Sequence, residues 1–139
     1  MDIRISLTDG VPIYQQIVTQ VRYLIAAGSL EPGIEMPPIR VLAEQLQVNP
    51  NTVARAYREL ELEGTVEKRS TRGTFVSDSG SKLATRHRQA ALHERIDQLL
   101  AESTQLGFSV DQLIKEIHSR SRVMERMQKK AGPGRGKSA

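Results

Sequence analysis

The chain has 139 residues, a formal net charge of +4 and no cysteine. This length supports one domain with at most a short appendage, and the missing cysteines exclude disulfides and thiolate metal sites. No apolar run approaches the roughly 20 residues that span a bilayer, and the first residues lack the profile of a signal peptide. We therefore expect a soluble, cytoplasmic protein.

The first part of the chain predicts an extended segment and two helices. Apolar and polar residues alternate over residues 3–6, which fits a short strand or an extended arm. A helix follows, because Pro12 suits a first helical turn, apolar residues recur at helical spacing and Gly28 suits the C-terminal end. A second, short helix is predicted over 39–46, with a turn at 47–48.

A third helix is predicted from Pro50 to Glu63, since Asn49 is a favourable N-cap and proline fits the first turn. After Gly64 the apolar period shortens to that of strands. Two short strands around the glycine-containing turn at 70–73 predict a β-hairpin. Three helices followed by a hairpin is the order of a winged helix-turn-helix.

The second half predicts two longer helices after a small, polar segment at 77–81, which is typical of a hinge or a domain boundary. The first helix breaks at 104–107, and Ser109 with Gln112 forms a capping box that starts the second. Residues 132–139 have no apolar anchor and predict a disordered basic tail. The apolar faces of the two helices contain Leu92, Ile96, Leu99, Leu100, Leu113, Ile114, Ile117 and Met124.

Two amphipathic helices of this size cannot bury both apolar faces alone, so they need a partner. A second copy of the chain is the simplest partner, and packing in cis onto the N-terminal part is the alternative. The pair also leaves little room for a ligand pocket of 300 Å³ or more, on the order of a small-molecule site. The residues leave open whether a small-molecule effector binds.

The third helix carries the main functional signal. Asn51, Arg55 and Arg58 fall on the face opposite its apolar stripe. Asparagine can pair with adenine and arginine with guanine in the major groove, and residues at the start of such a helix reach base edges. Asn51, Thr52 and Arg55 are therefore candidate base-reading residues. The alternative is an ordinary solvated helix face.

Three features favour DNA binding. The second and third helices are joined by only two or three residues, as in a helix-turn-helix. Arg40 lies at the start of the second helix, where its side chain and the helix's free N–H groups could together bind a phosphate. Arg72 and Gly73 form a basic hairpin tip suited to phosphate or minor-groove contact. The acidic residues at 59–63 are expected to be solvated and to point away from DNA.

Net charge alone does not indicate a nucleic-acid partner. Residues 1–79 hold 8 basic and 10 acidic residues, a balance of −2, whereas residues 80–139 hold 12 and 6, a balance of +6. The basic excess therefore lies outside the predicted winged helix. The case for DNA rests on where particular arginines lie.

Residues 12–76 closely resemble the winged helix-turn-helix of GntR-type regulators. The segments that carry the resemblance are 12–17, 28–33, 36–43, 48–60, 64–66 and 72–76. The resemblance implies a dimeric transcriptional regulator that binds a short inverted repeat. By position, it implies DNA-contacting roles for Arg40, Asn49, Asn51, Thr52, Arg55, Arg72 and Gly73.

Three positions depart from the family's usual pattern. Pro38 replaces the serine that caps the second helix, at a cost of about 1 kcal/mol. Pro50 stands where many members place a base-reading arginine, so base reading falls to Asn51 and Arg55. Gln47 occupies a turn position often held by glycine.

The short second half resembles the YtrA-type subfamily, whose helices serve dimerisation. We predict a mostly α-helical chain with a winged helix-turn-helix at 1–77, a two-helix dimerisation region at 78–131 and a tail at 132–139. The predicted function is a homodimeric repressor of transcription whose partner is a double-stranded DNA operator. The resemblance implies control of a neighbouring transporter operon.

Two alternatives stay open. An RNA-binding winged helix is disfavoured because Tyr57 and Phe75 are expected to be buried, which leaves no stacking aromatics. A protein-interaction module is the other. No catalytic residues, metal ligands or cofactor are predicted, because His87, His93 and His118 are scattered without partners at ligand spacing. The chain is not expected to be an enzyme or to bind a membrane.

Overall fold

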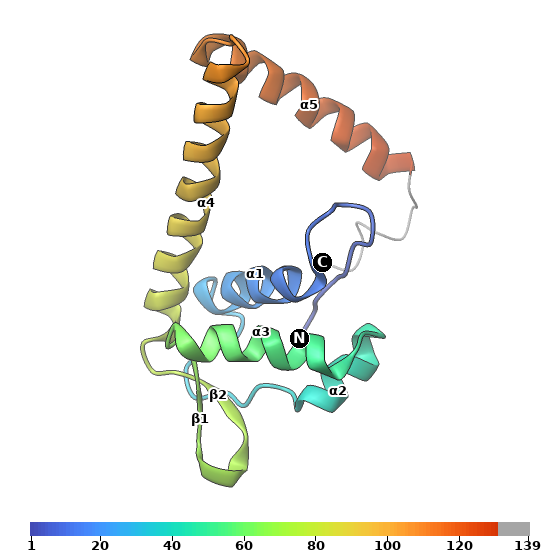
Figure 1. Cartoon of the computed structure of the whole chain (residues 1–139). Helices are drawn as coiled ribbons and strands as arrows, with labels where there is room; N and C mark the ends of the chain where they lie inside the picture. The colour runs from blue at the N-terminus through green and yellow to red at the C-terminus, as the bar shows by residue number, and fades with distance from the viewer. Residues whose placement is uncertain (131–139) are drawn as a thin grey trace. The chain divides into compact units, whose positions relative to one another are not determined.

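The computed structural model describes residues 1–130 and divides the chain into two compact units, Met1–Ala91 and one that begins at Leu92. The predicted tail at 132–139 lies outside the described residues. The fold is mostly helical with a two-stranded antiparallel sheet, which confirms the predicted fold class. The elements are α1 (Ile13–Ala26), α2 (Ile39–Leu46), α3 (Pro50–Leu62), β1 (Val66–Lys68), η1 (Ser70–Arg72), β2 (Thr74–Val76), α4 (Gly80–Gln105) and α5 (Val110–Lys130) (Figure 1).

The N-terminal segment is an extended arm, not a strand, and two glutamines of α1 hold its backbone. The Gln16 side-chain amide donates to the Ser6 carbonyl at 2.7 Å and its oxygen accepts from the Ser6 N–H at 2.8 Å. Gln20 makes the same pair of bonds with the backbone of Arg4, at 2.7 and 2.9 Å. These bonds satisfy the backbone as a neighbouring strand would, and they let Ile3 bury its side chain.

The core of the first unit lies between α1, α2 and α3. The apolar stripe predicted for α3 is buried and packs on the apolar face of α1; it consists of Val53, Ala56, Tyr57 and Leu60. The Tyr57 hydroxyl donates to the Pro37 carbonyl at 2.6 Å, which ties α3 to the segment before α2. Burial raises the pKa of the Tyr57 phenol well above its ordinary value. The fully or nearly fully buried residues of these helices are Ile17, Val18, Val21, Ile25, Leu42, Ala43, Val53, Ala56, Tyr57 and Leu60.

The turn between α2 and α3 has the tight geometry of a helix-turn-helix. α2 follows Pro38 without a side-chain cap, as expected for proline at that position. Its last turn closes through Gln47, whose φ of 55° lies in the left-handed region that glycine adopts most easily. The Asn49 side-chain oxygen then accepts from the Asn51 N–H at 2.8 Å, so the predicted N-cap of α3 is confirmed.

The predicted hairpin is present, with Val66 paired to Val76 and the short helix η1 in its tip. A third extended segment, which the sequence analysis missed, lies along the other edge of β2. Met36 N–H donates to the Thr74 carbonyl at 2.7 Å, and Val76 N–H donates to the Ile34 carbonyl at 2.9 Å. The hairpin, which is the wing of the fold, is therefore hydrogen-bonded along both edges of β2, to β1 on one side and to residues 34–36 on the other.

The segment that we expected to be a hinge is packed instead. Ser77 and Gly80 are buried, and α4 begins at Gly80 itself. A Cβ atom at Gly80 would lie 2.7 Å from the Thr65 carbonyl oxygen. Ala84, one turn further on, is fully buried in the same core. The first compact unit consequently continues past residue 77 to Ala91.

The second unit consists of the remainder of α4 and of α5. Ser109 and Gln112 form the predicted capping box, with side-chain-to-backbone bonds of 2.8 and 3.1 Å. None of the described residues of α5 is buried. Within residues 1–130, no helix is both long and apolar enough to cross a membrane.

Candidate nucleic-acid interface

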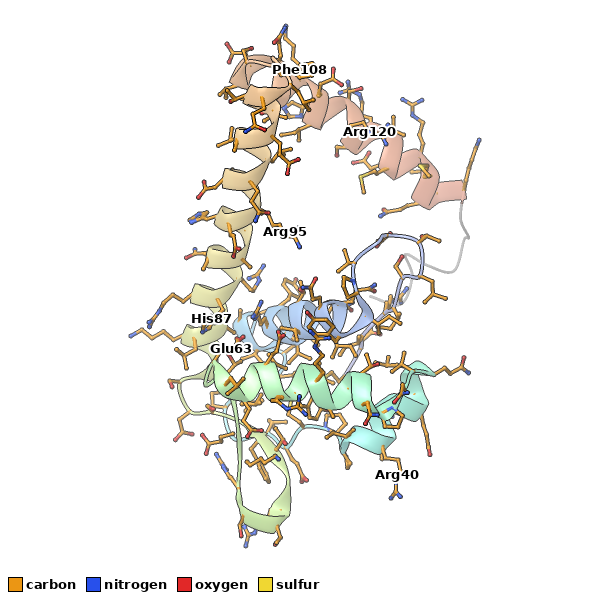
Figure 2. The ribbon with its side chains drawn as sticks, in the orientation of Figure 1. Arg40, Glu63, His87, Arg95, Phe108 and Arg120 are labelled. Carbon is orange, nitrogen blue, oxygen red and sulfur yellow. The ribbon has the colours of Figure 1, made fainter. Side chains whose placement is uncertain are left out.

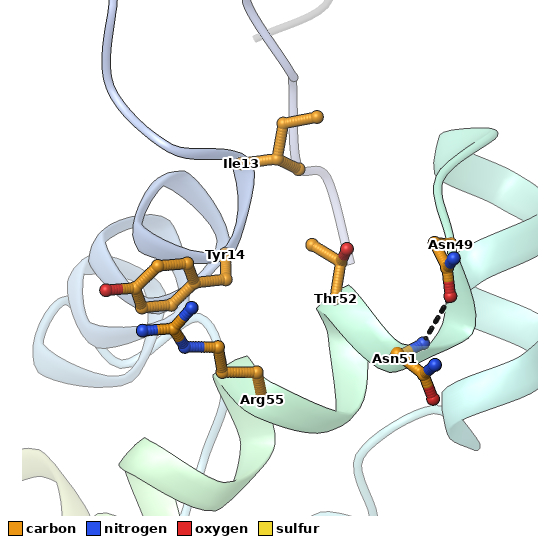
Figure 3. Close-up of a pocket in the computed structure, with 6 residues that line it drawn as sticks. All are labelled: Ile13, Tyr14, Asn49, Asn51, Thr52 and Arg55. Atoms are coloured by element: carbon orange, nitrogen blue, oxygen red, sulfur yellow. Dashed lines mark hydrogen bonds between the residues drawn. The ribbon is translucent and has the colours of Figure 1, made fainter.

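The start of α3 and the first turn of α1 together line an open pocket of about 430 Å³ (Figure 3). Four of the residues predicted from the sequence meet there, because α3 presents one face of its first two turns at this point. Ile13 and Tyr14 of α1 complete the lining. The full lining is Ile13, Tyr14, Asn49, Asn51, Thr52 and Arg55.

Arg55 is exposed, and its guanidinium lies over the Tyr14 ring at 3.7 Å from the centroid. Within residues 1–130 we find no hydrogen bond or ion pair made by this guanidinium. Its N–H donors, which lie in the guanidinium plane, remain available for a ligand. The sequence analysis missed Tyr14, and no local signal could have paired residues 41 positions apart in the chain.

The two asparagines at this end of α3 have different surroundings. The Asn49 oxygen accepts the cap bond from the Asn51 N–H, which fixes this side chain with its oxygen toward the helix and leaves its NH₂ as the main group for another partner. Asn51 is exposed, and none of the described residues hydrogen-bonds its side chain. The amide able to pair with a base edge through both its groups is therefore that of Asn51. Thr52 is half-buried beside it.

The remaining predicted residues lie outside the pocket. Arg58 is exposed further along α3. Arg40, the second residue of α2, is exposed and extends away from the helices (Figure 2). Arg72 is exposed at the hairpin tip, where Gly73 has a φ of 118° that favours glycine. Among residues 1–130, none of these three arginine side chains has a hydrogen-bond or ion-pair partner, so each is available to a backbone phosphate.

The acidic end of α3 differs from the expectation of a solvated face. Glu63 is half-buried and accepts hydrogen bonds from Arg22 of α1, the shortest at 2.6 Å. The Thr65 hydroxyl donates to the same carboxylate at 2.7 Å. This carboxylate joins α1 to the end of α3, at the opposite end of the helix from the pocket (Figure 2).

Within the described residues there is no group of three or more histidines, cysteines or acidic residues able to hold a metal ion. The arginines of this surface offer positive charge and hydrogen-bond donors, and the asparagines offer neutral amides that can donate and accept. Such groups recognise phosphates and base edges.

Comparison with known proteins decides the family. The family model for bacterial regulatory proteins of the gntR family matches residues 13–76. The transcriptional repressor YtrA of Bacillus subtilis is 36% identical over 118 residues, which cover 83% of this chain and 91% of that protein. The chain belongs to the GntR family. This GntR-family chain resembles the short YtrA-type regulators along most of its length.

Other relatives extend the comparison. The GntR-family chain is 49% identical to the regulator Rv1152 of Mycobacterium tuberculosis over 75 residues, 54% of this chain and 62% of that protein. A solved GntR-family regulator from Listeria monocytogenes aligns with a TM-score of 0.65 at 26% identity, covering 81% of this chain and 98% of that one. YtrA from Sulfolobus acidocaldarius aligns with a TM-score of 0.57 at 37% identity, covering 71% and 97%.

Proposed function

We propose that this GntR-family chain is a sequence-specific repressor that binds an inverted-repeat DNA operator as a homodimer in the cytoplasm. One observation carries the proposal: Asn51 and Arg55 are exposed at the start of α3, and no residue among 1–130 uses the hydrogen-bond donors of their side chains. A relative similar over most of the chain is named a transcriptional repressor. The family resemblance implies a neighbouring transporter operon as the target.

The residues divide into two roles. Asn51, Thr52 and Arg55 lie at the start of the second helix of the helix-turn-helix, where side chains reach base edges in the major groove. Arg40, Arg58 and Arg72 supply phosphate contacts, which fix the orientation of the protein and carry no sequence information. Asn49 caps α3 with its oxygen, and Gly73 gives the wing tip the backbone shape that presents Arg72.

The second unit supports dimerisation through its uncovered apolar surface. In a monomer this apolar surface would stay in contact with water, whereas pairing with a second copy would bury it, which is favourable. Pairing of two copies would also set the distance between the two half-sites. The exposed large apolar residues of this unit are Leu92, Ile96, Leu99, Leu106, Phe108, Val110, Ile114, Ile117, Met124 and Met127.

A mobility-shift titration tests the proposal. The probe is the inverted repeat upstream of the chain's own gene, with the same DNA carrying scrambled half-sites as the matched control. We expect preferential binding of the intact repeat, and an affinity that falls steeply with salt because phosphate contacts release counterions. Equal affinity for both duplexes, a preference for RNA, or no salt-dependent binding would contradict the proposal.

Two arginine variants separate base reading from phosphate contact. Arg55→Ala should lose about 1–3 kcal/mol on the operator and relax the preference at one position in each half-site. Arg40→Ala should weaken binding to intact and scrambled DNA by the same factor. Arg86→Ala, an exposed substitution on α4, is the control for removal of a positive charge. If Arg55→Ala keeps full affinity and preference, the face assigned to the groove is incorrect.

A further inference from the structure

The stack between Tyr14 and Arg55 occupies the face of the guanidinium and leaves its edge free. The guanidinium carbon lies 3.7 Å from the ring centroid, well within the range of a cation–π contact. All five N–H donors of arginine lie in the guanidinium plane, so stacking does not use them. Bidentate pairing with guanine requires that same edge.

We propose that Tyr14 is a positioning residue, which holds the Arg55 guanidinium in its base-reading orientation and thereby sets operator selectivity. This inference rests on the proposed function. The first turn of α1 thus takes part in recognition without touching a base, because the Tyr14 ring limits the orientations that the Arg55 side chain samples before DNA binds. A side chain ordered in advance loses less conformational freedom on binding.

Other arginines of the described chain show why this arrangement matters. Arg69 also lies over an aromatic ring, that of Phe75, at 4.8 Å, but its Nε–H donates to Glu67 at 3.2 Å. The edge of Arg22 is taken by the carboxylate of Glu63. Arg55 combines an occupied face with an edge to which no described residue makes a hydrogen bond or ion pair, which is the state needed for readout of a base. Arg88 has the same combination over the Tyr23 ring at 5.0 Å, but it lies on α4, outside the helix-turn-helix.

Tyr14 is held in place independently of Arg55. It is half-buried in the first turn of α1, and its hydroxyl accepts from the Gln15 side-chain amide at 3.3 Å. A leucine at this position would keep apolar bulk on α1 but offer no π face. A phenylalanine would keep the ring and lose only the hydroxyl. These two substitutions therefore separate the π face from the hydroxyl.

The binding test measures the ratio of affinities for the operator and for the operator altered at the base pair that Arg55→Ala identifies. We expect Tyr14→Leu to lower this ratio about two- to fivefold, the range of an exposed cation–π contact, and Tyr14→Phe to stay within about twofold of the wild type. In an Arg55→Ala background, Tyr14→Leu should change the ratio no further, because its effect acts through Arg55.

A DNA-independent readout completes the test. In the free full-length protein, NMR should show the Arg55 side-chain protons shifted by the ring current, with the shift retained in Tyr14→Phe and lost in Tyr14→Leu. Unfolding curves confirm that each variant is folded.

The outcomes distinguish the two proposals. A wild type that shows the ring-current shift but no operator preference overturns the proposed function. An operator preference that survives Tyr14→Leu, or an equal loss in the Arg55→Ala background, overturns the positioning role. A Tyr14→Phe protein as impaired as Tyr14→Leu also overturns it, since the hydroxyl would then be the group that acts.

Discussion

Replacing Gly80 with alanine tests whether the start of α4 is packed against the winged helix. The new methyl group would stand 2.7 Å from the Thr65 carbonyl oxygen and 3.1 Å from Val76 Cγ1. The shorter contact is with backbone, which cannot rotate away as the end of a flexible side chain can. Either α4 or the chain beside β1 must therefore shift.

The expected cost follows from two opposing effects. Added methyl groups in a packed core typically cost about 1–3 kcal/mol. Alanine in place of glycine favours a helix by up to about 1 kcal/mol in its interior, but Gly80 is the first residue of α4 and gains less. We therefore expect a net loss of about 1–3 kcal/mol. For a domain of this size, each kcal/mol lowers Tm by about 4–8 °C.

Thermal unfolding followed by circular dichroism measures this loss in the full-length protein. Lys82→Ala is the matched control, because it also introduces alanine near the start of α4 but at an exposed position, where it adds no bulk to the core. We expect the control to unfold within about 2–4 °C of the wild type, since a surface substitution changes stability by about 0.5 kcal/mol or less. A Gly80→Ala protein as stable as this control would refute the packed junction.

Three further predictions concern other parts of the chain. If the proposed homodimer forms through α5, Ile117→Glu should convert it to monomers in sedimentation velocity. His118→Glu adds the same charge at another exposed position of α5 and should leave the protein dimeric. Equal behaviour of the two variants would argue against the apolar interface. Asn49→Ala should cost about 1 kcal/mol of stability, and Asn49→Ser almost none, because serine also caps helices. Urea unfolding measures both losses, and equal losses would show that the cap bond contributes little. Tyr57→Phe should cost about 1–2 kcal/mol at pH 7 because the Pro37 carbonyl loses its buried donor. This difference in stability should shrink above about pH 10, because the phenol exposed by unfolding of the wild type then ionises and favours the unfolded state. A difference independent of pH would contradict the burial of this group.

The features predicted correctly depend on residues close together in the chain. The cap of α3 joins Asn49 to Asn51, and the box at the start of α5 joins Ser109 to Gln112. The buried stripe of α3 follows from helical period alone. The same locality explains why the candidate residues at the start of α3 were found: they share one helix, so their spacing already places them on one face.

The features that were missed join distant segments. Ile34–Met36 lies along β2 only because the fold brings a turn region beside the wing. The composition of 77–81 is typical of a hinge, yet the close approach of Gly80 to Thr65 makes the segment part of the core. The pattern around Glu63 is typical of a solvated helix face, yet Arg22 of α1 forms an ion pair with its carboxylate.

Local sequence patterns account for the order of elements, the helix caps and the polar face of α3, because a cap or a helical face is built from residues within one or two turns. The tertiary structure alone decided that Tyr14 lies beneath Arg55, and that the beginning of α4 belongs to the first unit. Both depend on how α1 packs on α3 and on how closely backbone segments approach, and these contacts form between residues that no local pattern relates.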